Sequence, residues 1–166
     1  MTFSRTLLVA LLTTAMAAPA IAARTSNTDY IDFSLGQAGA FDSDESTSYG
    51  VEYRYKDIGN GFRPIIGFTG DDEGAAYGYA GVDWDLQVAN SFYLIPTLAV
   101  GAYHQGDSQD LGGGLQFRTG VEAAYEFEQG NRLGVELSHL SNAGLHDRNP
   151  GTELLQVVYA HPLSWD

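Results

Sequence analysis

The sequence predicts an all-β protein, an eight-stranded antiparallel transmembrane β-barrel preceded by a cleaved signal peptide. Polar and apolar residues alternate through most of the chain after residue 22, and turn residues separate the alternating stretches without any helical period. Several stretches are longer than the roughly five or six residues of an ordinary strand, and long enough to cross a bilayer at a tilt. The amino terminus carries an export signal. Together these three observations favour a membrane barrel.

The export signal occupies residues 1–22. Arg5 precedes an apolar run from Leu7 to about Ala18, and Ala20-Ile21-Ala22 fits the small-x-small pattern of a cleavage site. A membrane-spanning helix is the alternative interpretation, but the run is short for the ~20 residues that a bilayer requires. We therefore expect a signal peptide over 1–22 and one barrel domain over 23–166.

The charge and the cysteine content limit the partners and the cellular location of this protein. The chain has 21 acidic and 8 basic residues, a net charge of −13. Nucleic acid is excluded as a partner, because binding to phosphates requires lysine and arginine. The chain has no cysteine, so an exported location must be tolerated without disulfides, which is compatible with a bacterial envelope.

Eight alternating segments are predicted as strands. They cover, approximately, residues 28–35, 49–56, 62–69, 75–88, 92–104, 114–127, 133–141 and 153–165. The connections after the second, fourth and sixth segments are short, and those after the first, fifth and seventh are longer. This asymmetry is typical of outer-membrane barrels, which have short periplasmic turns and longer outer loops. With a periplasmic amino terminus, an even strand count places the connection 142–152 outside.

The sense of the alternation decides between a membrane barrel and a soluble protein. In a membrane barrel, apolar side chains such as Trp84 and Phe117 face lipid, and the charged series fills the interior. That series includes Arg118, Glu122, Glu126 and Glu136. A soluble barrel or sandwich would reverse this arrangement, and alternation alone does not separate the two. The signal peptide, long strands and aromatic strand ends favour the membrane. The segments 62–69 and 92–104 cannot be oriented from their pattern.

Three polar residues lie on the apolar side of the last two predicted strands. His139 and Ser141 continue the apolar series Leu133, Val135, Leu137, and Glu153 begins the series Leu155, Val157, Tyr159. Residues two apart share a face of a strand, and an antiparallel hairpin would bring Glu153 within ~5 to 8 Å of the other two. Polar groups that face lipid are costly unless they are paired or near the interface.

The three residue types are those of a nucleophile, a base and an orienting acid. We predict that His139 takes the proton of Ser141 and that Glu153 fixes the histidine tautomer. The connection that follows could stabilise an oxyanion through the side-chain amide of Asn142 and the backbone N–H of Gly144. The alternative interpretation is an interfacial polar belt that merely ends the apolar band.

The run SHLSNAGLHDRNPGTE, which begins at Ser138, resembles the signature of the lipid A 3-O-deacylase family (PagL type). The resemblance covers about residues 133–163 and implies an eight-stranded barrel in the Gram-negative outer membrane with its catalytic groups on the outer wall. It assigns Ser141 as nucleophile, His139 as base, Glu153 as acid, and Asn142 and Gly144 to the oxyanion hole. It further implies hydrolysis of an ester-linked 3-hydroxyacyl chain at position 3 of lipid A. The resemblance implies no cofactor, and it allows a homodimer.

Other polar residues give weaker signals. Arg148 lies in the predicted site connection and is a candidate contact for a lipid A phosphate. The histidines have no metal-ligand spacing, so no metal site is predicted, and we expect His161 to be interfacial. The acid pairs Asp71-Asp72 and Asp107/Asp110 either bridge divalent cations or form solvated loops.

Two observations leave alternatives open. The chain places Asp166 after Trp165, whereas outer-membrane strands typically finish on an aromatic residue. Two other functions also fit a small barrel: a non-catalytic adhesin or structural protein, and an acyltransferase that passes the chain to an acceptor other than water.

Overall fold

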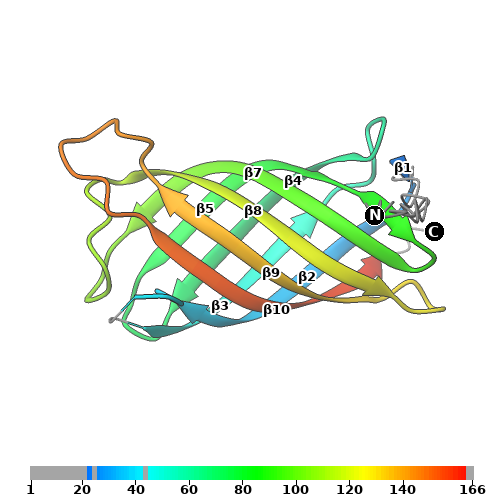
Figure 1. Ribbon diagram of the computed structural model, residues 1–166, viewed down its shortest axis with the longest axis horizontal. Coiled ribbons are helices and arrows are strands. Elements are labelled where there is room, and N and C mark those ends of the chain that lie inside the picture. The colour runs from blue at the N-terminus through cyan, green and yellow to red at the C-terminus, as the bar shows by residue number, and fades with distance from the viewer. Residues whose placement is uncertain (1–21, 24–25, 43–44, 164–166) are drawn as a thin grey trace, which may run out of the picture.

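The computed structural model describes residues 22–23, 26–42 and 45–163, which form a β-barrel (Figure 1). The predicted signal peptide lies outside the described residues except for Ala22, whose backbone pairs with Gln87. The strands are β1 (Ala22–Ala23), β2 (Asp29–Ala38), β3 (Ser46–Arg54), β4 (Phe62–Asp71), β5 (Ala76–Trp84), β6 (Leu86–Ala89), β7 (Phe92–His104), β8 (Leu115–Glu126), β9 (Arg132–Ser141) and β10 (Thr152–Leu163). Within these ranges, no helix is long and apolar enough to cross a membrane.

The sheet closes on itself. Each strand from β2 to β4 pairs antiparallel with the next, β5 and β6 both pair with β7, and β7 pairs with β8. The pairs β8–β9, β9–β10 and β10–β2 complete the ring. Because β5 and β6 together form one wall segment, the wall has eight strands, as predicted. The short strand β1 pairs with β6 beside this ring.

Asp85 divides the predicted segment 75–88 into β5 and β6. Its carboxylate is fully buried and lies 3.3 Å from Arg63 Nε and 3.0 Å from Arg132 Nη1. Its backbone N–H donates to the carbonyl of Gly61 at 2.9 Å, and the pairing with β7 shifts register between Gln87 and Ala89. The strand thus breaks at the residue whose carboxylate contacts two buried guanidinium groups. The alternation pattern does not reveal this break.

The outer face of the barrel is apolar and its interior is polar. Large exposed side chains include Phe33, Leu98, Val135 and Val157 on four different strands. The structure also orients the two segments that the pattern left open. The outward residues are Phe62, Ile66 and Phe68 on β4 and Leu94, Leu98 and Val100 on β7; the inward residues are Arg63, Ile65 and Thr69 on β4 and Tyr93, Ile95 and Ala99 on β7. The soluble alternative, with a dry apolar core, is therefore wrong.

Arg54 is the centre of the interior charge cluster. Its guanidinium group lies 2.9 Å from Asp32, 2.8 Å from Asp83 and 3.0 Å from Glu122, and all four side chains are buried. The other predicted interior charges are also paired, Arg118 with Glu136 and Glu126 with Arg132. Charges in a barrel of this width neutralise one another because little water is present to do so.

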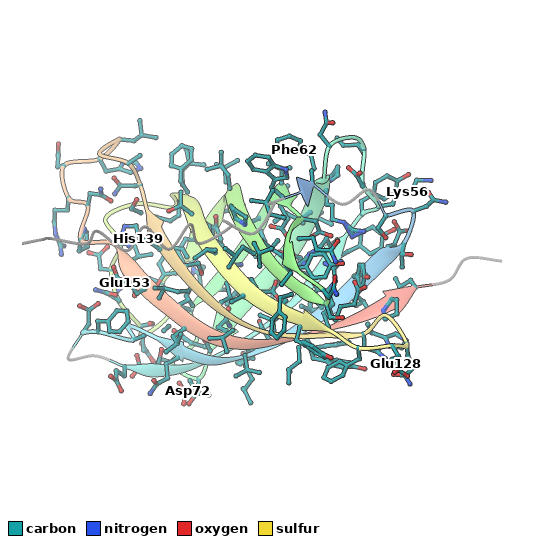
Figure 2. The ribbon with its side chains drawn as sticks, turned by 45° about the vertical axis from the view of Figure 1, so that its right-hand side comes forward. Lys56, Phe62, Asp72, Glu128, His139 and Glu153 are labelled. Carbon is teal, nitrogen blue, oxygen red and sulfur yellow. The ribbon has the colours of Figure 1, made fainter. Side chains whose placement is uncertain are left out.

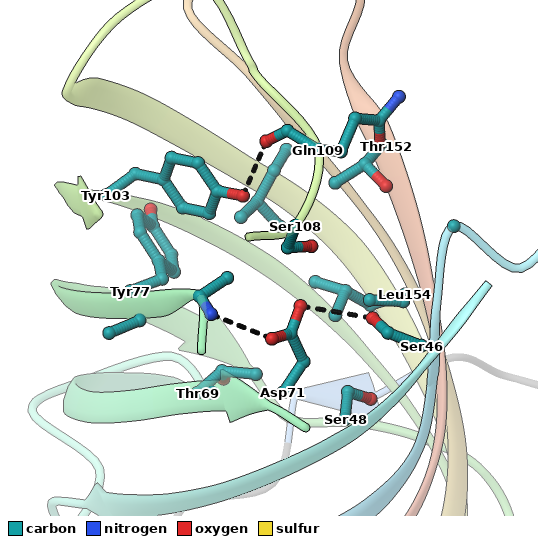
Figure 3. A pocket seen from close by; sticks show the side chains of 16 residues that line it. Ser46, Ser48, Thr69, Asp71, Tyr77, Tyr103, Ser108, Gln109, Thr152 and Leu154 are labelled. Carbon is teal, nitrogen blue, oxygen red and sulfur yellow. Dashed lines mark hydrogen bonds between the residues drawn. The ribbon is translucent and has the colours of Figure 1, made fainter. Parts of the chain in front are cut away.

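The outer end of the barrel is closed by the connection 105–114. Leu111 inserts into the mouth and is 1% exposed, packed with a cluster that includes Tyr77, Leu140 and Leu154. Residues of this end also line a cavity of about 30 Å³, in which Asp71 accepts hydrogen bonds from Ser46 Oγ and the Ala75 N–H (Figure 3). A cavity of this size holds one or two waters. An acyl chain therefore does not fit in this cavity.

Replacement of Arg54 by leucine should lower the free energy of unfolding by about 3–5 kcal/mol, because the carboxylates around it would lose their buried cation. Urea unfolding in lipid vesicles, followed by tryptophan fluorescence, measures the change. Arg148→Leu is the matched control, since its ion pair with Asp110 is exposed and should contribute less than about 1 kcal/mol. Equal losses in the two variants would contradict the cluster's role.

Candidate functional site

Strands β9 and β10 place His139 and Glu153 directly opposite each other. On β9 the inward residues from Arg132 to Leu140 are buried, whereas the intervening residues face outward. His139 belongs to this outward series, and so does Glu153 on β10. Figure 2 shows the two side chains near the end of the wall that carries the connection 142–151. His139 and Glu153 therefore both face outward, as the alternation of polar and apolar residues predicted.

The two side chains are in contact. His139 Nδ1 lies 3.0 Å from Glu153 Oε1, and the side chains are 45% and 34% exposed. Because an ionised carboxylate can only accept a hydrogen bond, this contact requires the hydrogen on Nδ1. In the neutral ring, Nε2 then has a free lone pair that can accept a proton. This is the arrangement that a general base needs.

Ser141 lies on the same outer face, two residues beyond His139 towards the loop. It is partly exposed and pairs with Phe117 of β8. No hydrogen bond joins Ser141 Oγ to the imidazole among the described residues. The structure therefore brings His139 and Glu153 together and places Ser141 beside them without completing the chain of hydrogen bonds.

Gly151 is a site residue that the sequence reasoning missed. A Cβ atom at this position would lie 2.5 Å from His139 Cε1 and 3.0 Å from Nε2, and the backbone φ is +71°. The edge of the ring that carries Nε2 therefore rests on the bare backbone of Gly151. The dipeptide Pro150-Gly151 signals a turn. Nothing in the sequence indicates that the imidazole of His139 lies where a side chain at position 151 would be.

Asn142 organises the connection 142–151. It is fully buried, and its side-chain amide donates to the carbonyls of Leu111 and Arg148 at 3.0 and 2.6 Å. Its Oδ1 accepts from the Gly144 N–H at 3.0 Å, and its own N–H donates to Asn149 Oδ1 at 2.9 Å. Both groups predicted for an oxyanion hole therefore have partners within the loops. Asn149 is a second contributor that the sequence reasoning did not identify.

The weaker candidates have specific positions. Arg148 has a 68% exposed side chain, and its Nη1 lies 2.8 Å from Asp110 Oδ2. His161 Nδ1 lies 2.9 Å from Asn131 Oδ1 on an exposed surface. The solvated-loop alternative is wrong for Asp71, because its carboxylate is buried and accepts hydrogen bonds from backbone N–H groups of the turn between β4 and β5. In the described part of the chain, no group of three or more potential ligands is placed to hold a metal ion.

A sequence model of the family described as lipid A 3-O-deacylase (PagL) matches residues 46–162. This range contains most of the barrel and all of His139, Ser141 and Glu153. The chain belongs to the lipid A 3-O-deacylase (PagL) family.

Individual relatives agree over shorter stretches. The lipid A deacylase PagL of Bordetella bronchiseptica is 33% identical over 51 residues, which cover 31% of this chain and 29% of that protein. The lipid A deacylase PagL of Pseudomonas aeruginosa is 38% identical over 55 residues, which cover 33% of this chain and 32% of that protein. The chain thus aligns with about a third of the length of each of these curated relatives.

Two solved structures share the fold. The crystal structure of the outer membrane enzyme PagL superposes with a TM-score of 0.62 at 22% identity and covers 81% of this chain and 99% of its own. A structure from the de novo design of transmembrane β-barrels gives a TM-score of 0.58 at 13% identity, covering 85% and 99%. This family member therefore shares the barrel fold of both structures.

Replacement of Gly151 by alanine should displace the His139 ring and weaken its contact with Glu153, because the new Cβ would overlap the imidazole edge. Proton–nitrogen NMR of histidine-labelled protein in detergent should show altered ring-nitrogen signals for His139. Gly130→Ala is the control: its φ is +83°, so it carries similar backbone strain, but its nearest contact is Pro162 Cγ at 3.6 Å. Unchanged His139 signals in a folded Gly151→Ala barrel would contradict the assignment.

Proposed function

We propose that this protein is an esterase of the Gram-negative outer membrane that hydrolyses the ester-linked 3-hydroxyacyl chain at position 3 of lipid A. Ser141 is the nucleophile, His139 the base and Glu153 the orienting acid. The observation that carries the proposal is the 3.0 Å contact between His139 Nδ1 and Glu153 Oε1 on the lipid-facing wall. Family membership supports the substrate class. The buried polar interior and apolar outer face support the membrane location.

The first chemical step forms an acyl-enzyme. Ser141 Oγ attacks the ester carbonyl carbon while its proton passes to His139 Nε2, and the bond from that carbon to the sugar oxygen then breaks as the oxygen takes the same proton. Glu153 stabilises the imidazolium that exists between the two transfers. Ser141 Oγ and His139 Nε2 must come within hydrogen-bond distance in the substrate complex. Such contacts often tighten only there.

The second step releases the fatty acid. His139 takes a proton from a water molecule whose oxygen attacks the acyl carbon, the bond from this carbon to Ser141 Oγ breaks, and the serine regains the proton. The products are the 3-hydroxy fatty acid and the free enzyme. The reaction needs no cofactor. Because the site is on the outer wall, the acyl chain can stay in the outer leaflet throughout.

The connection after Ser141 supplies the donors for the oxyanion in this proposal. The Gly144 N–H would exchange its 3.0 Å contact with Asn142 Oδ1 for the developing oxyanion. The N–H of Ala143, which has no acceptor among the described residues, is the second donor in this proposal. The Asn142 side chain holds this connection in place.

Replacement of Ser141 by alanine should abolish deacylation, because the nucleophile is lost. Mass spectrometry of lipid A from expressing cells measures the loss of one hydroxyacyl mass, which should occur only with the wild type. Glu153→Gln should lower the rate by about 10²–10⁴-fold through loss of imidazolium stabilisation. The fate of the released chain separates hydrolysis from acyl transfer, since hydrolysis yields free fatty acid.

Assembly of each variant is verified by its heat-dependent mobility in gel electrophoresis. The proposal would be contradicted if lipid A lost the acyl chain with both the wild type and Ser141→Ala. It would also be contradicted if both proteins were assembled and neither caused the loss. The family resemblance also allows a homodimer. Light scattering of the purified wild-type protein in detergent measures the protein mass, and twice the mass of one chain would support a dimer.

Arg148 is the proposed contact for a lipid A phosphate. It lines a hollow at the rim of the barrel together with the acids Glu45, Glu73, Asp107 and Asp110, and it is the basic residue of that set. Arg148→Ala should raise KM several-fold with little change in kcat, because binding that is equal in ground and transition states affects KM alone. Asp110→Ala, which frees the guanidinium group, should lower KM. Unchanged KM values in both variants would exclude this role.

A further inference from the structure

Thr119 is a polar residue in the middle of an apolar strand face. The other outward residues of β8 are Leu115, Phe117, Val121, Ala123 and Tyr125. Thr119 is exposed and has no hydrogen-bond partner for its hydroxyl among the described residues. Leu115 and Phe117 lie between it and the loop end, so Thr119 does not belong to the polar rim. A hydroxyl that faces lipid without a partner is costly, which points to a partner that arrives with the substrate.

The sheet places Thr119 beside the candidate active site. Thr119 pairs directly with His139 on β9, which pairs with Glu153 on β10, so the three form one row across the outer wall. Ser141 is the diagonal neighbour of Thr119 on the same face, at the ~7–8 Å that separates such positions. The row therefore contains a fourth polar group that the proposed triad does not use.

The imidazole leaves Thr119 free for the substrate. Nδ1 of His139 faces Glu153, and the edge with Cε1 and Nε2 lies against Gly151. Glu153 and Gly151 are both on the β10 side of the ring, whereas Thr119 is on the β8 side. The hydroxyl of Thr119 thus borders the space that an ester attacked by Ser141 would occupy.

We propose that Thr119 is a specificity-determining residue that hydrogen-bonds the hydroxyl group of a 3-hydroxyacyl chain. An ester carbonyl bound at Ser141 sends its acyl chain down the wall, away from the loop end and past Thr119. Carbon–carbon bonds of about 1.5 Å and a hydrogen bond of about 2.8 Å give a hydroxyl two carbons beyond the carbonyl a reach of about 7 Å. That reach matches the diagonal between Ser141 and Thr119. This inference rests on the proposed esterase function.

The test compares two glucosamine 3-O-esters of equal chain length, one with a 3-hydroxyacyl chain and one with an unsubstituted chain. The purified full-length protein in detergent should favour the hydroxylated ester about tenfold in kcat/KM, the worth of one hydrogen bond. Thr119→Val keeps the shape and removes the hydroxyl, so the ratio should fall to near one. Thr119→Ser restores the hydroxyl and should retain the preference. Thr47→Val removes an outward threonine hydroxyl far along the sheet and should leave the ratio unchanged.

The outcomes separate this inference from the function on which it rests. A wild type without preference, or a Thr119→Val variant with the wild-type preference, overturns the role of Thr119 while hydrolysis itself stands. Cleavage of neither ester by the assembled wild type overturns the proposed function, and the role of Thr119 with it.

Discussion

Closure of the strand ring is the constraint on which the rest of the structure depends. Within a bilayer every backbone N–H and C=O needs a partner in the protein, and the β10–β2 and β7–β8 pairings leave the ring without an open edge. A closed wall surrounded by lipid must turn its apolar side chains outward. The interior then receives the polar ones, and eight strands leave a space that side chains alone can fill. The ion pairs of Arg54 follow from this restriction, because each buried charge must find its counterion inside the ring.

The filled interior determines where chemistry on a lipid can take place. The cavity of about 30 Å³ at the mouth admits water and no acyl chain, which supports the proposal that a lipid substrate binds on the outer wall. On that wall polar residues are exceptions. His139 and Glu153 contact each other there, and Thr119 extends their row with no hydrogen-bond partner for its hydroxyl in the described part of the chain. Facing and register together explain why these positions lie next to one another on the outer face.

The interior and the outer site are connected at the loop end. Leu111 fills the mouth with its side chain and accepts a hydrogen bond from the Asn142 amide through its carbonyl. Asn142 directly follows Ser141, and its other amide hydrogen binds the carbonyl of Arg148. One buried side chain thus links the connection that closes the barrel with the connection that carries the proposed oxyanion donors. The packing of the mouth thereby holds in position the loop that follows the proposed nucleophile.

The sequence by itself determined the number of wall strands, their facing where charges alternate with apolar residues, and the proximity of His139 to Glu153. These features follow from the period of two and from hairpin pairing, which are local properties of the chain. Only the tertiary structure decided the break at Asp85, the orientation of β4 and β7, the burial of Asp71 and the engagement of the Asn142 amide. It also revealed Gly151 and Thr119 as neighbours of the imidazole. Each of these depends on contacts between strands or loops that are distant in sequence, and such contacts arise only when the barrel closes.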